Sequence, residues 1–299
     1  MASKIQWTGE TLNPIRARDI ATGRVGWFCE HASDGCRFCY AEAMNNWRGN
    51  RIPYLHQNRA KVEIFLDDDV LRKAMAWQKP KTIFPCSMTD MFADFVTNTM
   101  LDSIFAVMAI TERHTWQPLT KRPERALAYI EDRCRTTASF SGPAAIVSAA
   151  DRLCGAQMTP PELRNRLPLP NVHLGTSIEQ RRHLWRLDHL RLTPAALRWI
   201  SLEPLLEDIG PLDLTGISWV VIGGESGKHA RPFYLRWALD IIAQCEAAGV
   251  AVFVKQIGSN PMGLDGLPFK VQHEKGGDMD EWPPLLRVRQ MPGARTDGR

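Results

Sequence analysis

The chain lacks the long apolar runs that mark membrane-spanning or exported proteins. No apolar stretch approaches the ~20 residues needed to cross a bilayer, and the first residues, MASKIQWTGETLNP, contain no long apolar signal-peptide core. We therefore expect a cytoplasmic protein with no membrane partner. Internal repeats in the solenoid range and low-complexity tracts are also missing, which excludes repeat arrays and extended disorder.

Strong charge of either sign is missing too. The formal net charge is +4, from 37 Lys and Arg against 33 Asp and Glu, which permits a nucleotide or nucleic-acid partner without requiring one. Hydrophobic residues make up 44% and charged residues 23% of the chain, as in ordinary globular proteins. A chain of 299 residues suits one large α/β domain, and we expect a single domain over 1–299.

Cysteine is present in an odd number, seven, and three of these residues are close together. In a cytoplasmic protein such residues are free thiols or metal ligands rather than disulfides. Cys29, Cys36 and Cys39 follow the spacing C-x6-C-x2-C. The short second gap lets two thiolates converge, and Phe38 lies between them. The remaining cysteines are interpreted as ordinary thiols: Cys86, Cys134, Cys154 and Cys245.

Three thiolates leave the nature of the site open. A structural zinc ion takes four ligands, so His31 or His56 would have to supply the fourth. A [4Fe–4S] cluster held by three cysteines instead leaves one iron free to bind a small molecule. The third alternative is three thiols without any metal, which leaves the spacing unexplained.

Apolar runs that end abruptly in polar residues alternate with helix-like stretches along most of the chain. Six such runs are found in KTIFPCSMTD, HTWQPLTKRP, NVHLGTSIE, LRWISLEP, ISWVVIGGESG and VAVFVKQIG. A seventh strand is expected at TLNPI or VGWF near the start. Alternating strands and helices indicate parallel βαβ units. The fold class is therefore α/β, with a partial or complete (βα) barrel of parallel strands.

In such a barrel the carboxyl ends of the strands meet at one mouth. The polar residues at these ends would then form one ring. Strand ends can also be polar simply because loops are exposed to solvent. The ring consists of Ser87, Asp90, Lys121, Ser177, Glu179, Glu203, Gly223, Gly224, Glu225 and Lys255.

The cysteine spacing resembles that of the radical S-adenosylmethionine (SAM) superfamily, in which the usual pattern is C-x3-C-x2-C on a loop early in a (βα) barrel. The first gap here is longer. This resemblance implies that Cys29, Cys36 and Cys39 bind a [4Fe–4S] cluster, that its open iron binds SAM, and that Phe38 packs against the adenine. An external electron donor would reduce the cluster.

A closer resemblance covers most of the chain. It is carried by IQWTGETLNP, GCRFCYAEAM, SMTDMF, LTKRPERA, LPNVHLGTSIE, SLEPLL, WVVIGGESGKHARP and VFVKQIG, in that order. These blocks resemble a phage-associated family with a three-cysteine motif and unknown function. The sequence departs from that family by an extra stretch, IRARDIATGRVGW, and by a long insert after Arg133.

If SAM binds, the polar ring has to hold its charged and polar groups. Asp90 lies where it could accept hydrogen bonds from the ammonium, and Ser177 and Glu179 lie where they could bind the ribose hydroxyls. Ser87 is a further candidate for binding the cofactor. Lys121, with Arg122, would pair with the SAM carboxylate or a substrate phosphate. The segment GGESG, with Gly223, Gly224 and Glu225, allows close backbone approach to a ligand. Glu203 and Lys255 are candidate acid–base residues.

Two segments depart from the βα pattern. Residues 134–169 read as an inserted loop with one or two short helices, which we expect to act as a lid. From about residue 260 the chain is rich in Gly, Pro and charge, and we expect a surface tail.

The preferred function is a radical SAM enzyme that cleaves SAM to a 5′-deoxyadenosyl radical, with a nucleotide or nucleic acid as substrate. One alternative is a nucleic-acid-binding protein stabilised by zinc or an iron–sulfur cluster, without catalysis. Another is a barrel hydrolase in which Asp90, Glu179 and Glu203 hold a hydrated metal ion.

Overall fold

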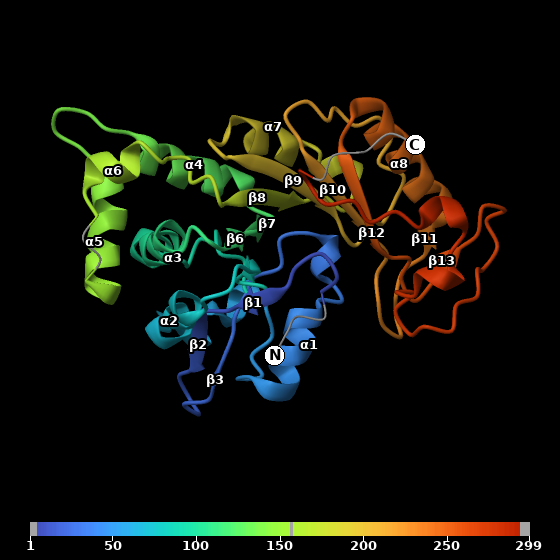
Figure 1. Cartoon of the computed structure of the whole chain (residues 1–299). Coiled ribbons are helices and arrows are strands. Elements are labelled where there is room, and N and C mark those ends of the chain that lie inside the picture. Colours follow the sequence, from blue (N-terminus) through green and yellow to red (C-terminus); the bar gives the residue numbers. More distant parts are fainter. Residues whose placement is uncertain (1–4, 156–157, 294–299) are drawn as a thin grey trace. The chain divides into compact units, whose positions relative to one another are not determined.

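The computed structural model describes residues 5–155 and 158–293, and the chain divides into two compact units (Figure 1). Unit 1 comprises Met1–Gly175 with His189–Leu197, and unit 2 comprises Thr176–Asp188 with Arg198–Arg299. Among the described residues, no helix has both the length and the apolar character needed to cross a membrane.

The helices are α1 (Tyr40–Arg48), α2 (Asp68–Ala76), α3 (Asn98–Ile110), α4 (Pro123–Cys134), α5 (Gly142–Cys154), α6 (Pro160–Arg164), α7 (Trp185–Leu192) and α8 (Leu235–Ala248). The strands are β1 (Glu10–Leu12), β2 (Ile15–Asp19), β3 (Val25–Gly26), β4 (Val62–Leu66), β5 (Thr82–Pro85), β6 (Thr115–Trp116), β7 (Leu119–Thr120), β8 (His173–Ser177), β9 (Leu197–Leu202), β10 (Trp219–Gly223), β11 (Phe233–Tyr234), β12 (Ala251–Gln256) and β13 (Pro261–Met262).

Parallel strands dominate, as the alternation of strands and helices predicts. One sheet has the order β1-β5-β6, and a five-stranded sheet has the order β12-β10-β9-β8-β7. Residues 115–120 contribute β6 to the first sheet and β7 to the second. The seventh strand lies at TLNPI, where β1 pairs with β5. The α/β class is confirmed, and the described residues show no closed barrel.

The stretch IRARDIATGRVGW, which departs from the family resemblance, forms a small antiparallel sheet. Strand β2 pairs with both β3 and β4, so VGWF contributes an antiparallel strand and not a barrel strand. Ala17 of β2 and Val62 of β4 pack in a core cluster with Phe28, Ala41 and Tyr54. This sheet supports the loop that carries the three cysteines.

The strands of unit 2 are buried on both faces. All five residues of β10 are buried, and the Trp219 ring lies 5.1 Å from that of Trp199 and 6.1 Å from that of Phe253. Helix α8 packs against β12 (Figure 1). It ends at Gly249, whose φ of 66° is left-handed and suits glycine. Continuous apolar strands of this kind are typical of parallel sheets.

The insert after Arg133 is helical and packs on other helices. Its helix α5 contacts α3, α4 and α6 (Figure 1), burying Ile146, Ala150 and Leu153. This cover explains why α3 is buried on nearly every side, from Leu101 to Ala109. The buried face of α5 is committed to the helix layer, and the expected role of the insert as a lid stays a prediction. Residues 156–157 of the insert lie outside the described residues.

The last part of the chain packs closely instead of forming a surface tail. The backbone around Arg289 pairs antiparallel to β12, with hydrogen bonds from Val254 to Val288 and from Gln290 to Val252. Trp282 is buried and donates its indole N–H to the carbonyl of Gly276 at 3.0 Å. The expected tail therefore covers the edge strand of the sheet; its final residues, 294–299, lie outside the described residues.

Candidate functional site

The three cysteines lie on one short loop of unit 1, between β3 and α1. Cys29 follows the buried Phe28, Cys36 ends a single 3-10 turn, and Cys39 is the N-cap of α1. Cys29 and Cys39 both pack against the core cluster that contains Phe28 and Tyr54. Because the antiparallel sheet and α1 share this cluster, the loop has a fixed support.

Each of the three sulfurs accepts hydrogen bonds from backbone amides. The Asp90 amide lies 3.4 Å from Cys29 Sγ, and the Ala32 amide lies 3.4 Å from Cys36 Sγ. Cys39 accepts from the amides of Glu42 and Ala41 in the first turn of α1. Amide donors stabilise a thiolate over a thiol and tune iron–sulfur clusters.

Burial acts in the opposite direction on two of these thiols. It raises the pKa of Cys29 to about 12, and the nearby Asp90 carboxylate adds to the effect. Burial likewise raises the pKa of Cys39, while its amide partners lower it. Arg122 near Cys29 and Lys121 near Cys39 lower these pKa values but do not outweigh burial, so both sulfurs are protonated at neutral pH.

Neither histidine near the loop is placed as a fourth metal ligand. His31 Nε2 lies 2.9 Å from Glu42 Oε2, and His56 Nδ1 lies 3.3 Å from Glu30 Oε2. Across residues 5–155 and 158–293, no group of three or more His, Cys, Asp or Glu could hold a metal ion in this conformation. A single zinc ion would need sulfurs within ~4 Å of one another, from tetrahedral bonds of about 2.3 Å. A cluster binds each sulfur to a different iron, so the sulfurs stand farther apart.

A network around Asp90 ties the cysteine loop to the ends of β5 and β7. Asp90 Oδ1 accepts from the Thr120 hydroxyl at 2.7 Å and from the Phe92 amide at 3.0 Å. Its Oδ2 accepts from the Lys121 amide at 2.8 Å and from Arg122 at 3.2 Å. Arg122 also donates to the carbonyl of Glu30, next to Cys29, at 3.0 Å. Both charged side chains are largely buried.

A second set of contacts joins β1 and β5 to the same loop. Asn13, just after β1, accepts from the Ser87 hydroxyl at 3.1 Å and from the Met88 amide at 3.0 Å. The Thr89 hydroxyl donates to the carbonyl of Phe28 at 3.0 Å. Tyr40, the first residue of α1, donates to the carbonyl of Ser87 at 2.6 Å. Sequence reasoning missed Asn13, although it lies in the block IQWTGETLNP.

The predicted residues of unit 1 are thus gathered around the cysteines. Ser87 and Asp90 contact the loop directly, and Lys121 joins through its backbone amide. The Phe38 ring is 38% exposed, with the Arg37 guanidinium 5.3 Å from its centroid. Its expected packing against adenine stays a prediction.

Unit 2 brings together a second group of predicted residues, at the carboxyl ends of β9, β10 and β12. Lys255 Nζ lies 3.0 Å from Glu203 Oε1, and the Ser201 hydroxyl donates to Glu203 Oε2 at 3.2 Å. A Cβ atom on Gly223 would collide with the Glu203 carboxylate. Glycine at this strand end therefore makes room for the ion pair.

The other predicted acids of unit 2 are paired with arginines that sequence reasoning did not single out. Glu179 is fully buried and contacts Arg186 and His183, both at 3.1 Å. Arg186 also donates to the carbonyl of the buried Ser177 at 2.7 Å. No pattern in the sequence marks this arginine, because it lies in an ordinary charged helix.

Glu225 is likewise paired, since Arg231 reaches it through Nε at 2.9 Å and through a terminal nitrogen at 2.6 Å. The amide of Gly224 donates to the carbonyl of Gln256 at 3.0 Å. The predicted hydrolase carboxylates, Asp90, Glu179 and Glu203, each have a cationic partner. Because the charge of each acid is already balanced by a cationic side chain, the structure does not favour binding of a hydrated metal ion by these three acids.

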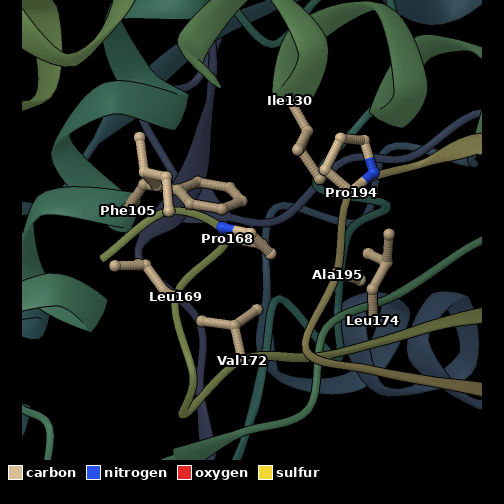
Figure 2. Close-up of a pocket in the computed structure, with 9 residues that line it drawn as sticks. Phe105, Ile130, Pro168, Leu169, Val172, Leu174, Pro194 and Ala195 are labelled. Carbon is tan, nitrogen blue, oxygen red and sulfur yellow. The ribbon is translucent and has the colours of Figure 1, made fainter. Parts of the chain in front are cut away.

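Figure 2 shows an apolar hollow in unit 1. It is lined by Phe105, Ile130, Leu167, Pro168, Leu169, Val172, Leu174, Pro194 and Ala195. None of these residues belongs to the predicted site, and none has an ionisable side chain. The hollow is a packing feature beneath α3 and α4 and offers no group for catalysis.

Comparison with known proteins gives one match. No curated protein and no solved structure matches the chain significantly. A family model described as protein of unknown function (DUF5131) matches residues 2–283. This match spans both units and includes the three cysteines and every predicted site residue. The chain belongs to the DUF5131 family.

Proposed function

We propose that the protein is a radical SAM enzyme whose [4Fe–4S] cluster is held by Cys29, Cys36 and Cys39. The observation that carries the proposal is the set of three cysteines on one supported loop, each with a backbone N–H directed at its sulfur. The parallel strands would then belong to a partial (βα) barrel of the radical SAM type. The proposal also includes the resemblance to a phage-associated family. It further includes a cytoplasmic location.

The donor set fits a cluster better than a single ion. The loop offers three sulfurs, one fewer than the four ligands that a structural zinc ion takes. Three ligands leave one iron open, and the bound cluster would supply the electron that cleaves SAM to a 5′-deoxyadenosyl radical. An external electron donor completes the reaction.

In this proposal Asp90 holds the loop. Its two carboxylate oxygens accept four hydrogen bonds, and an ionised carboxylate has about four acceptor positions. Little capacity remains for the SAM ammonium, so Asp90 acts by fixing Cys29 through its amide and Glu30 through Arg122. Lys121 remains the candidate for the SAM carboxylate or a substrate phosphate, and Phe38 the candidate for the adenine.

The group in unit 2 contains a candidate acid–base pair of its own. Glu203 and Lys255 form a partly exposed ion pair in which each charge stabilises the other. Such a pair can hold or move a proton at a substrate atom. Ser177, Glu179, Gly223, Gly224 and Glu225 would shape this region, with Glu179 and Glu225 acting through their arginine partners. We expect the substrate to be a nucleotide or nucleic acid.

The test is anaerobic reconstitution with iron and sulfide. We expect about four iron and four sulfide per chain, and 5′-deoxyadenosine after addition of SAM and a reductant. Cys36→Ala should lose the iron and sulfide and also the formation of 5′-deoxyadenosine. The control Cys154→Ala, at the exposed end of α5, should retain all of them. Tight zinc without SAM affinity would favour the non-catalytic alternative. Iron content unchanged by Cys36→Ala would overturn the proposal.

A further inference from the structure

Helix α1 exposes an apolar face beside the cysteine loop. Tyr40, Met44 and Trp47 follow one another at spacings of four and three residues, so they share one side of the helix. Their exposed fractions are 53%, 42% and 67%, and Phe38, just before the helix, is 38% exposed. Ala41 and Asn45 of the same helix are buried. An exposed apolar stripe of this length usually marks a binding surface.

The stripe is held rigidly in place. The Tyr40 hydroxyl is anchored at the carbonyl of Ser87. At the other end of α1, Asn45 donates to Asn50 at 2.8 Å, and Asn50 donates to the carbonyls of Ala17 and Trp27, both at 3.1 Å. Aromatic rings fixed in advance lose little conformational entropy when a ligand binds.

Positive charge accompanies these rings. The Arg48 guanidinium lies 3.9 Å from the centroid of the Trp47 ring, and Arg37 lies beside Phe38. Exposed Arg51 has a φ of 67°, a left-handed conformation that is costly for a side chain other than glycine. Strained positions of this kind cluster at functional sites.

The charge balance of the surrounding segment is also positive. Residues 16–61 contain eight Lys and Arg against four Asp and Glu, an excess equal to the net charge of +4 on the whole chain. Arg18 in this segment is paired with Glu63, whereas Arg37, Arg48 and Arg51 are exposed beside the rings. A ligand at this surface would therefore be an anion.

We propose that this α1 surface, defined by Tyr40, Met44 and Trp47 with Arg37, Arg48 and Arg51, binds single-stranded nucleic acid. Flat rings and guanidinium groups stack on bases, and the arginines neutralise phosphates. Tyr40 and Trp47 lie ~10 Å apart along the helix, at about 1.5 Å per residue, which spans two or three nucleotides. An acidic peptide would use the arginines but not the aromatic faces.

This inference deepens the proposed function by giving its nucleic-acid substrate a binding surface, yet its chemistry does not need the cluster. A duplex keeps its bases stacked inside, whereas a single strand offers them to aromatic side chains. The surface therefore predicts a preference for single strands with little dependence on sequence.

The experiment measures fluorescence anisotropy of labelled, mixed-sequence 12-nucleotide DNA and RNA with the full-length reconstituted protein. Trp47→Ala should weaken binding about tenfold, since one stacked base contributes about 1–3 kcal/mol, and Trp47→Phe should restore most of it. The matched control is Phe140→Ala, which removes another exposed ring with an arginine, Arg135, 5.0 Å away. It should leave binding unchanged.

A second measurement follows the salt dependence. Replacing Arg48 and Arg51 by Gln should reduce the slope of log K against log salt by about 1.4, at about 0.7 per phosphate contact for single strands. Equal binding by Trp47→Ala and wild type would overturn the proposal. So would tighter binding to duplex, or displacement by polyglutamate at equal charge, which would indicate an acidic protein partner.

The two proposals fail separately. Iron content and 5′-deoxyadenosine formation report on the cluster, while anisotropy reports on the α1 surface. Oligonucleotide binding without iron would leave this inference standing and defeat the proposed function. Iron binding and SAM cleavage without oligonucleotide binding would leave the proposed function standing and overturn this inference.

Discussion

At the scale of single residues, Asp90 shows how a side chain can serve a site without contacting a ligand. Its backbone amide donates to Cys29, and its carboxylate gathers Thr120, Lys121 and Arg122. A residue with this many partners fixes two strand ends and the cysteine loop together. Its contribution should appear in both stability and iron binding.

We therefore predict that Asp90→Ala lowers the free energy of unfolding by about 3–5 kcal/mol, because it leaves the partly buried Arg122 without its counter-ion. Iron bound after reconstitution should fall as well, since the loop around Cys29 loses its anchor. Asp240→Ala, at an exposed carboxylate of α8, is the control and should change neither quantity. Chemical denaturation and iron analysis measure the two effects. Unchanged iron content in folded Asp90→Ala would refute the anchoring role.

Gly223 makes a comparable contribution through the absence of a side chain. We predict that Gly223→Ala forces the Glu203 carboxylate away from Lys255 and costs about 1–3 kcal/mol, the usual penalty of overpacking. The double variant Gly223→Ala with Glu203→Ala should lose less than the sum of the two single variants, because the collision is gone. Additive losses in thermal unfolding would show that the clash is not the cause.

At the scale of elements, the insert acts as an added helical layer. Helix α5 buries Ile146, Ala150 and Leu153, and Arg152 donates to Ser103 of α3 at 2.9 Å. These contacts complete the burial of α3, whose sequence is apolar on nearly every side. The insert therefore contributes to the core of unit 1.

We predict that Ile146→Ala destabilises the protein by about 2–5 kcal/mol, the range for a large-to-small change in a core. Ser148→Ala, at an exposed position of the same helix, should have no measurable effect. Iron content should be unchanged in both variants, because α5 does not contact the cysteine loop in its main packing. A variant with normal stability but altered SAM cleavage would instead support a lid.

At the scale of the whole molecule, the buried His114 and the half-buried His173 make stability depend on pH. Burial lowers the pKa of His114 and of His173 below the ordinary value of 6.5. His114 is fully buried, with Nε2 3.0 Å from the carbonyl of Ala74. A lowered pKa means that the unfolded chain binds the proton more readily than the folded one. The contribution of these histidines to the free energy of unfolding is therefore fully present above about pH 6.5 and is lost as the pH falls below that value.

We predict that His114→Gln, which keeps an N–H donor, reduces the loss of unfolding free energy between pH 7.5 and pH 5.5. His229→Gln, at an exposed position, should leave the pH dependence as in the wild type. Urea denaturation at the two pH values measures both. An equal loss in His114→Gln and wild type would assign the pH dependence to other groups.

The sequence by itself determined the local features of this protein. Apolar runs between helix-like stretches predicted the parallel strands, and the polar residues that end them identified Asp90, Glu203 and Lys255. The spacing of the cysteines likewise indicated a loop with three convergent thiols. These features depend on residues close together in the chain, where periodicity and turn chemistry act directly.

Only the tertiary structure decided which charged side chains form ion pairs and which surfaces are buried. Arg186 and Arg231 could not be identified from the sequence as partners of Glu179 and Glu225, because a pairing depends on how a helix rotates against a strand. The packing of α5 on α3 and the pairing of the final segment along β12 could not be identified from the sequence either. Such choices depend on burying apolar area between segments distant in sequence, and no local pattern encodes that packing.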